Sequence, residues 1–108
     1  MIISIQEVEK ILDAARKFTQ AGKLEWVRMS GVKFAANFTN SSLSIVRSED
    51  SFSFYVINGQ GVPIGGIFAR GDDSKIGSLY VYIERKDSLV DETLKNIWDG
   101  FDDLHKRL

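Results

Sequence analysis

The residue types that most often perform catalysis are scarce in this chain of 108 residues. It has no cysteine, and its single histidine, His105, stands close to the end. The lack of cysteine excludes thiolate chemistry, disulfides and cysteine metal sites. His105 precedes Lys106 and Arg107 in the last turn of an expected helix, where cations interact favourably with the helix dipole. We therefore predict no catalytic residue and expect that the protein is not an enzyme.

The carboxylates and glycines do not form a recognisable ligand site. Glu49 and Asp50 are expected in a turn, and neither a calcium-loop spacing nor a two-histidine zinc helix occurs. Five further carboxylates fall on the expected outer side of the last helical segment: Asp91, Glu92, Asp99, Asp102 and Asp103. Gly59 to Gly61 and the pair Gly65 and Gly66 are not followed by the lysine of a phosphate-binding loop. We expect these glycines to serve a turn and a bulged strand, and we predict no metal and no cofactor.

Aromatic and arginine residues are the strongest candidates for binding. Several aromatic side chains exceed what one small core readily buries, and arginines are expected at strand ends. Both residue types are enriched in protein interfaces. Stacking on nucleic acid would need an electropositive groove, and the acidic residues interspersed among the basic ones argue against one. The predicted partner-binding residues are Trp26, Arg28, Arg47, Tyr55, Arg70 and Tyr82.

Composition predicts one ordinary globular domain over residues 1–108. Hydrophobic residues make up 44% and charged residues 27%, with a formal net charge of −1. These values give no reason to expect disorder or a general attraction to nucleic acid. The N-terminus lacks the basic start and apolar stretch of a signal peptide, and no apolar run approaches the ~20 residues that span a bilayer. We expect a cytoplasmic protein that does not bind membranes.

Apolar spacing predicts an N-terminal helix followed by a sheet. Three- and four-residue spacing predicts a helix over 5–20, with Ser4 and Glu7 as a capping box and Gly22 as its stop. The period then changes to two, and the short connections favour an antiparallel meander. Pro63 places the fifth strand at an edge or at a bulge. The five predicted strands are marked by Leu24/Trp26, Phe34/Ala36/Phe38, Leu43/Ile45, Phe52/Phe54/Val56 and Val62/Ile64/Phe68. The opposite, partly wet face is expected to carry Lys33, Asn37, Thr39, Ser44, Arg47, Ser53 and Tyr55.

The C-terminal third is expected to contain two helices. Helical spacing over 76–83 favours a helix capped by Asp72 or Asp73, although β propensity keeps a strand over Ser78–Ile83 open. A second helix is expected from about residue 88 to the end. Gly100 within it lowers helix stability by about 1 kcal/mol relative to alanine and suggests close approach of another element. This second helix, capped by Ser88 or Asp91, is expected to close the domain with one stripe: Val90, Leu94, Ile97, Trp98, Phe101, Leu104 and Leu108.

Parts of the chain resemble a known structural pattern: residues 22–26, Leu79-Tyr80 with residues 84–86, and Val90, Asp91 and Leu94. They resemble small, functionally uncharacterised bacterial proteins with a helix, a β-meander and two closing helices. Gly77 and Val81-Tyr82 depart from this pattern. The resemblance implies a fold, with a helical Leu79-Tyr80 segment, and no activity.

The predicted fold is α+β: a single antiparallel β-meander of about five strands, with N-terminal and C-terminal helices packed on one face. The other face stays free. Our first functional hypothesis is a non-enzymatic interaction module of bacterial or phage origin, which binds a protein partner or itself through that face or an edge strand. The alternative is a small-ligand or nucleotide binder with a pocket between sheet and helices, anchored by Arg47, Arg70 or Tyr55.

Overall fold

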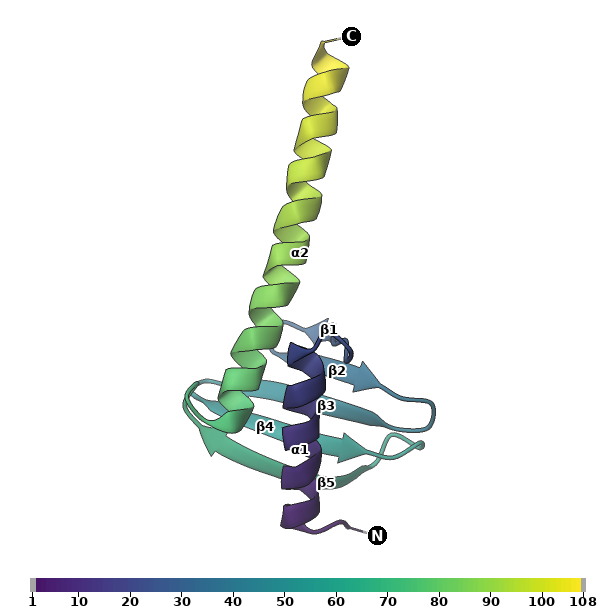
Figure 1. Cartoon of the computed structure of the whole chain (residues 1–108), viewed down its shortest axis with the longest axis vertical. Helices are drawn as coiled ribbons and strands as arrows, with labels where there is room; N and C mark the ends of the chain where they lie inside the picture. The colour runs from purple at the N-terminus through teal and green to yellow at the C-terminus, as the bar shows by residue number, and fades with distance from the viewer. Residues whose placement is uncertain (1, 108) are drawn as a thin grey trace.

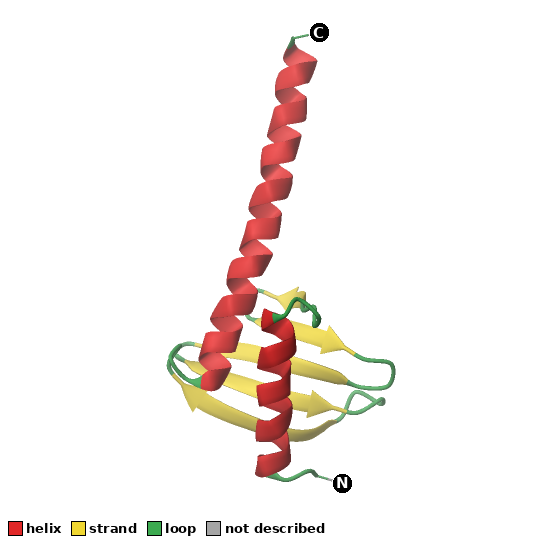
Figure 2. Ribbon diagram, viewed as in Figure 1, coloured by secondary structure: helices red, strands yellow, loops and turns green. Residues whose placement is uncertain are grey.

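The computed structural model describes residues 2–107 and confirms the α+β meander with a helix at each end. Both helices lie across the same face of the sheet (Figure 2). The elements are α1 (Ile5–Gln20), β1 (Val27–Ser30), β2 (Lys33–Asn37), β3 (Ser42–Ser48), β4 (Ser51–Ile57), β5 (Pro63–Arg70) and α2 (Lys75–Lys106).

The sheet has the order β1-β2-β3-β4-β5, and every neighbouring pair is antiparallel. As predicted, Pro63 begins an edge strand that also carries an irregularity. Val56 pairs with Gly65 and Ile57 with Pro63, so Ile64 is an extra residue in β5. An extra residue reverses which face the following side chains point to.

Five predicted strand positions are wrong. Val62 precedes β5 and is 52% exposed. Leu24 and Trp26 precede β1 instead of forming it, and they pack against the core as loop residues. Phe38 lies after the end of β2 and is exposed. The extra residue in β5 turns Phe68 to the open face, where it is 68% exposed, and gives the core positions to Ile67 and Ala69.

Arg47 was also expected on the wrong face. It follows Leu43 and Ile45 at two-residue spacing in β3 and pairs with the buried Phe52 of β4. Side chains at this spacing share one face of a sheet, so Arg47 lies on the side that the helices cover. Its guanidinium stands 5.5 Å from the ring centre of Tyr80.

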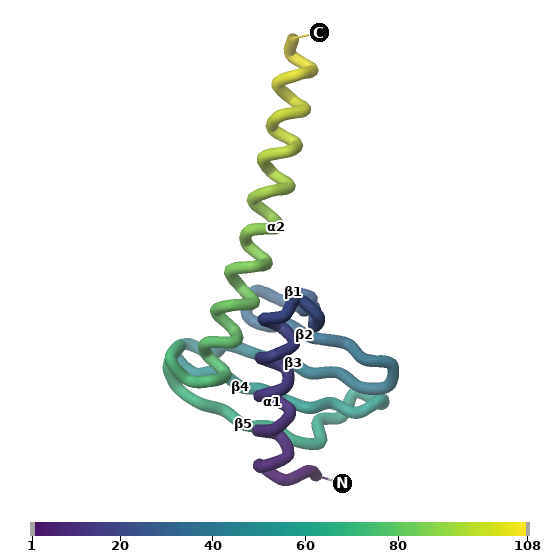
Figure 3. The backbone as a smooth tube through the Cα atoms, in the orientation of Figure 1, coloured from purple at the N-terminus to yellow at the C-terminus, as the bar shows by residue number. Residues whose placement is uncertain are grey.

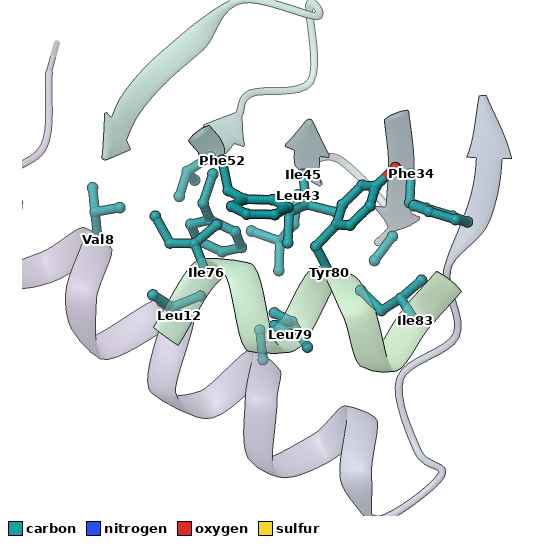
Figure 4. Packing of buried hydrophobic residues seen from close by; sticks show 14 residues of the cluster. Val8, Leu12, Phe34, Leu43, Ile45, Phe52, Ile76, Leu79, Tyr80 and Ile83 are labelled. Carbon is teal, nitrogen blue, oxygen red and sulfur yellow. The ribbon is translucent and has the colours of Figure 1, made fainter. Parts of the chain in front are cut away.

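The core lies between this face and the two helices (Figure 4). Tyr80 of α2 is fully buried between two phenylalanines, with ring centres 5.5 Å from Phe34 and 5.3 Å from Phe52. Burial of such side chains contributes about 1.5–3 kcal/mol each. The other members of the core are Val8, Leu12, Ala15, Ala36, Leu43, Ile45, Phe54, Val56, Ile76, Leu79 and Ile83.

The predicted bounds of α1 are confirmed, together with the Ser4 half of the predicted capping box and the Gly22 stop. Ser4 accepts a hydrogen bond from the backbone N–H of Glu7 at 3.1 Å, and Gly22 follows the helix with a φ of 73°. Gly65 of β5 lets α1 approach the sheet closely, because a Cβ there would come 2.6 Å from Ile3 and 2.8 Å from Val8.

The C-terminal third forms one helix where two were expected. Ser78–Ile83 is helical, so the strand alternative is wrong. The cap is Ser74, which accepts from the N–H of Gly77 at 3.0 Å, and not Asp72 or Asp73. Gly77 is required by close packing, because a Cβ there would overlap the backbone of the preceding turn.

No helix begins at Ser88 or Asp91. Both residues lie inside α2, which is 32 residues long. Its length is about 48 Å at 1.5 Å per residue, more than the sheet can cover. The molecule is therefore elongated, 62 × 31 × 24 Å, with the end of α2 far from the sheet (Figures 1 and 3). The helix expected to close the domain projects from it instead. Leu108 lies outside the described residues.

Candidate interaction surface

We distinguish two parts of the molecule. The head comprises residues 2–87, with α1, the sheet and the start of α2. The arm comprises residues 88–106, the rest of α2. Every residue of the arm is exposed.

The arm carries most of its large apolar side chains on one face, with Leu89 outside it. Five of them, the arm seam, alternate at four- and three-residue spacing: Val90, Leu94, Ile97, Phe101 and Leu104. Their exposed fractions run from 49% to 59%. Trp98 borders the seam, is 64% exposed and contacts Phe101 edge-on with ring centres 5.7 Å apart. Such spacing is typical of a helix that packs against another helix.

The arm seam continues the face by which α2 packs on the sheet. Ile76, Tyr80 and Ile83 follow the same four- and three-residue spacing, and Val90 comes seven residues after Ile83. The position between them is Asp87, the one polar residue in the series. One apolar series is therefore buried by the sheet in the head and left uncovered in the arm.

Arg28 of β1 fastens α2 at the boundary between head and arm. Its Nε donates to Asp87 Oδ2 at 2.8 Å, and its guanidinium lies 4.6 Å from the ring centre of Phe34. The hydrogen bond to Asp87 raises the pKa of the Arg28 guanidinium. Arg28 therefore contacts both the sheet and the helix at the point where the arm leaves the head.

A cavity of about 430 Å³ lies beside this boundary. Trp26 forms part of its wall, and its indole N–H donates to Thr19 Oγ1 at 2.9 Å. Thr19 in turn donates to the carbonyl of Ala15, so both polar groups are satisfied. The cavity is also lined by Gly22, Leu24, Glu25, Ile83, Lys86, Asp87 and Val90.

A larger groove, of about 980 Å³, runs between the start of α1 and the edge strand β5. Most of its wall is apolar, including Ile5, Ile64 and Phe68. No arginine lines this groove or the smaller cavity. The predicted polar anchors Arg47 and Arg70 therefore do not converge in either space, and only Tyr55 of the three borders one.

The six predicted partner-binding residues do not form one surface. Trp26, Arg28 and Arg47 lie on the helix-covered side, where they contact Thr19, Asp87 and Tyr80. Tyr55 and Arg70 belong to the open face of the sheet. Tyr82 is half-buried on α2, with the Lys86 ammonium 5.0 Å from its ring centre. Whether any of the six binds a partner stays a prediction.

The arm seam is the surface that the sequence reasoning missed. Its residues were identified as one helical stripe but assigned to the core. Two signals in the sequence could have indicated that this stripe lies outside the core. One is the strict alternation of four- and three-residue spacing, and the other is a helical pattern longer than the sheet can cover. A 20-residue helix already spans about 30 Å, the diameter of a small domain.

One polar atom of the core has no partner. The hydroxyl of Tyr80 is buried and makes no hydrogen bond to any described residue. Burial raises the pKa of Tyr80, to which the nearby Glu84 carboxylate adds. The hydroxyl therefore stays protonated at neutral pH and is an energetic cost within the core.

Comparisons with protein-family models, curated proteins and solved structures find no match for this chain. Between residues 2 and 107, the helices lack the combination of length and apolar character needed to cross a membrane. Within the same range, no three His, Asp or Glu residues are grouped so that they could hold a metal ion.

Proposed function

We propose that this protein is a non-enzymatic interaction module that binds a protein partner through the arm seam and Trp98. One observation carries the proposal: six large apolar side chains share one face of the arm, each 49–64% exposed and uncovered by the described chain. The proposal includes the cytoplasmic, bacterial or phage setting expected from the sequence.

The physical argument rests on the cost of leaving this face in water. Monomeric soluble proteins rarely expose contiguous apolar patches larger than a few hundred Å², and larger patches mark interaction sites. Amphipathic helices typically bind by placing seam residues in a groove or against another helix. Isolated helices of about this length are also marginally stable in water unless their apolar face is packed.

The test compares two phenylalanines at different surfaces. Phe101→Asp places a charge in the arm seam, and Phe68→Asp places one on the open face of the sheet; both side chains are exposed, by 50% and 68%. Each variant and the wild type are used as bait in extracts of the source cells, with bound proteins, including the bait chain itself, quantified by mass spectrometry. We expect Phe101→Asp to lose partners that Phe68→Asp retains.

The opposite pattern would contradict the proposal. If Phe68→Asp loses the partners while Phe101→Asp keeps them, binding belongs to the open face of the sheet or to the groove that Phe68 borders, and not to the arm. If neither variant changes what is bound, the arm is not the interaction surface. Circular dichroism of both variants checks that helix and sheet are intact.

The groove between α1 and β5 supports a second candidate function, binding of a small apolar ligand. Its volume of about 980 Å³ falls within the range of ligand sites, and its wall is mostly apolar. An apolar fluorescent dye is the probe. Ile5→Asp, at the groove, should abolish dye binding if the groove is the site, whereas Ile97→Asp in the arm should not. Binding that survives Ile5→Asp would contradict this candidate.

A further inference from the structure

We infer that the partner of the arm is a second copy of this chain, bound so that the two arms run antiparallel and their seams interdigitate. This inference rests on the function proposed above and names the occupant of the same surface. It follows from three features of the arm: the spacing of its seam, the order of its charges and the area it can bury.

The spacing of the arm seam suits a helix of the same kind. Alternation of four and three residues is the a/d pattern of coiled coils, in which each seam side chain fits between side chains of the facing helix. In an antiparallel pair centred near residue 99, Ile97 lies opposite the partner's Phe101, and Leu94 opposite the partner's Leu104. Every described seam residue from Leu94 onward then meets a seam residue.

The charges of the arm favour the antiparallel direction. Asp91 and Glu92 stand near its start, whereas Lys106 and Arg107 stand at its end. In the antiparallel pair, the two carboxylates lie at the level of the partner's Arg107 and Lys106 along the axis. Glu92 and Lys106 lie on the side of the helix away from the seam, so the attraction is between oppositely charged helix ends and not between contacting ion pairs. In a parallel pair, each basic end would face the other basic end, which is unfavourable.

Gly100 fits the same arrangement. A Cβ at this position would meet no atom of the described chain within 4 Å, so nothing in the molecule itself requires a glycine in the middle of the arm. In the antiparallel pair, Gly100 flanks the seam at the two-fold axis. The absence of a side chain there allows the partner helix to come close.

The area is sufficient for a stable dimer. The five seam residues and Trp98 give six half-exposed side chains per chain. Covering about 100 Å² of each in both copies would bury on the order of 1,200 Å², above the ~1,000 Å² expected of a specific interface. The contact uses the same patch on both copies, as two-fold symmetry requires.

The first measurement is the solution mass of the purified full-length protein by light scattering and sedimentation. The chain has a mass of 12.2 kDa, and we expect twice this value over a dilution series from submillimolar to micromolar. Phe101→Asp should raise the dissociation constant by about 100-fold or more, because a carboxylate would be buried in the seam. Phe68→Asp should leave the dimer unchanged. A monomer across the whole series would overturn the inference.

The second measurement gives the direction of the pair. Because the chain has no cysteine, Ser88→Cys provides a single exposed site for a spin label. The backbone positions at residue 88 would lie about 33 Å apart along the axis in the antiparallel pair, against about 10 Å between neighbouring parallel helices. A short distance between the labels would overturn the antiparallel arrangement.

The two proposals fail in different ways. If the pure protein is a monomer and Phe101→Asp still loses a different protein in the binding experiment, self-association is wrong but the arm remains an interaction surface. If the pure protein is a dimer that Phe68→Asp dissociates and Phe101→Asp does not, both proposals are wrong.

Discussion

The two parts of α2 carry the same kind of apolar face in different surroundings. In the head, Tyr80 and Ile83 of the apolar series are almost completely buried by the sheet and α1. In the arm, Leu94 and Phe101 follow the same spacing and are half exposed. The pattern of a helix therefore specifies that one face must be covered, but the covering surface is set by what lies beside it.

A polar residue and an ion pair lie at the boundary between the two parts of α2. Asp87 occupies the only position of the apolar series that is polar, and it bonds to Arg28 of the first strand. Beyond this ion pair the sheet ends, and the apolar series continues without a partner in the described chain. The predictions below test the contrast between head and arm, from the largest effect to the smallest.

Matched leucine truncations should give the largest contrast. Leu79→Ala removes a side chain that is 2% exposed, and we expect it to lower the free energy of unfolding by about 2–5 kcal/mol through a cavity in the core. Leu94→Ala removes a side chain that is 51% exposed. It should change the free energy of unfolding by less than about 0.5 kcal/mol under conditions where the chain is monomeric. Urea denaturation of both variants measures this. Equal effects would show that arm and head are covered alike in a single chain.

Breaking the ion pair at the boundary should have a smaller effect. Asp87→Asn removes the charge that holds Arg28, and we expect a loss of about 0.5–1 kcal/mol because both side chains are partly exposed. A double-mutant cycle with Arg28→Gln separates the pair from the contact of Arg28 with Phe34. A coupling near zero would mean that the pair does not anchor α2.

Removal of the unpartnered hydroxyl should cost nothing. Tyr80→Phe deletes a buried group without a hydrogen bond, so we expect the free energy of unfolding to stay equal or to rise by up to about 1 kcal/mol. A clear loss of stability in urea would show that the hydroxyl has a partner. Tyr80→Leu, which changes the shape of the ring site, is the destabilising control.

The same residue predicts a pH dependence. Tyr80 has a raised pKa in the folded protein, so its neutral form persists to higher pH than in the unfolded chain. Its contribution to stability is fully present below the unfolded value of about 10 and is lost as the pH rises above it. The thermal midpoint of the wild type should therefore fall more steeply above pH 10 than that of Tyr80→Phe. Parallel curves would contradict this assignment.

Shortening the arm should have the smallest effect on the head. A chain that ends at residue 91 keeps all core residues and the ion pair at Asp87. We expect its free energy of unfolding to match the monomeric full-length chain within about 0.5 kcal/mol, measured by urea denaturation at low concentration. A head that unfolds without the arm would show that the arm stabilises its own chain.

Local sequence signals determined much of the head. The Ser4 cap and Gly22 marked the ends of α1, and two-residue spacing with short turns predicted the meander and most of its buried residues. These features depend on neighbours in the chain, where spacing and turn chemistry act directly. Pro63 and its glycines likewise predicted an irregular edge strand.

Tertiary structure decided the rest. The extra residue in β5 turned Phe68 away from the core, and Gly77 allows a close backbone contact in the first turn of α2. Most of all, the sequence of 88–106 predicted an apolar helical stripe but not what covers it. A helix has the same pattern whether it packs on its own sheet or on another molecule, and only the length and direction of α2 relative to the sheet place this stripe beyond the reach of the core.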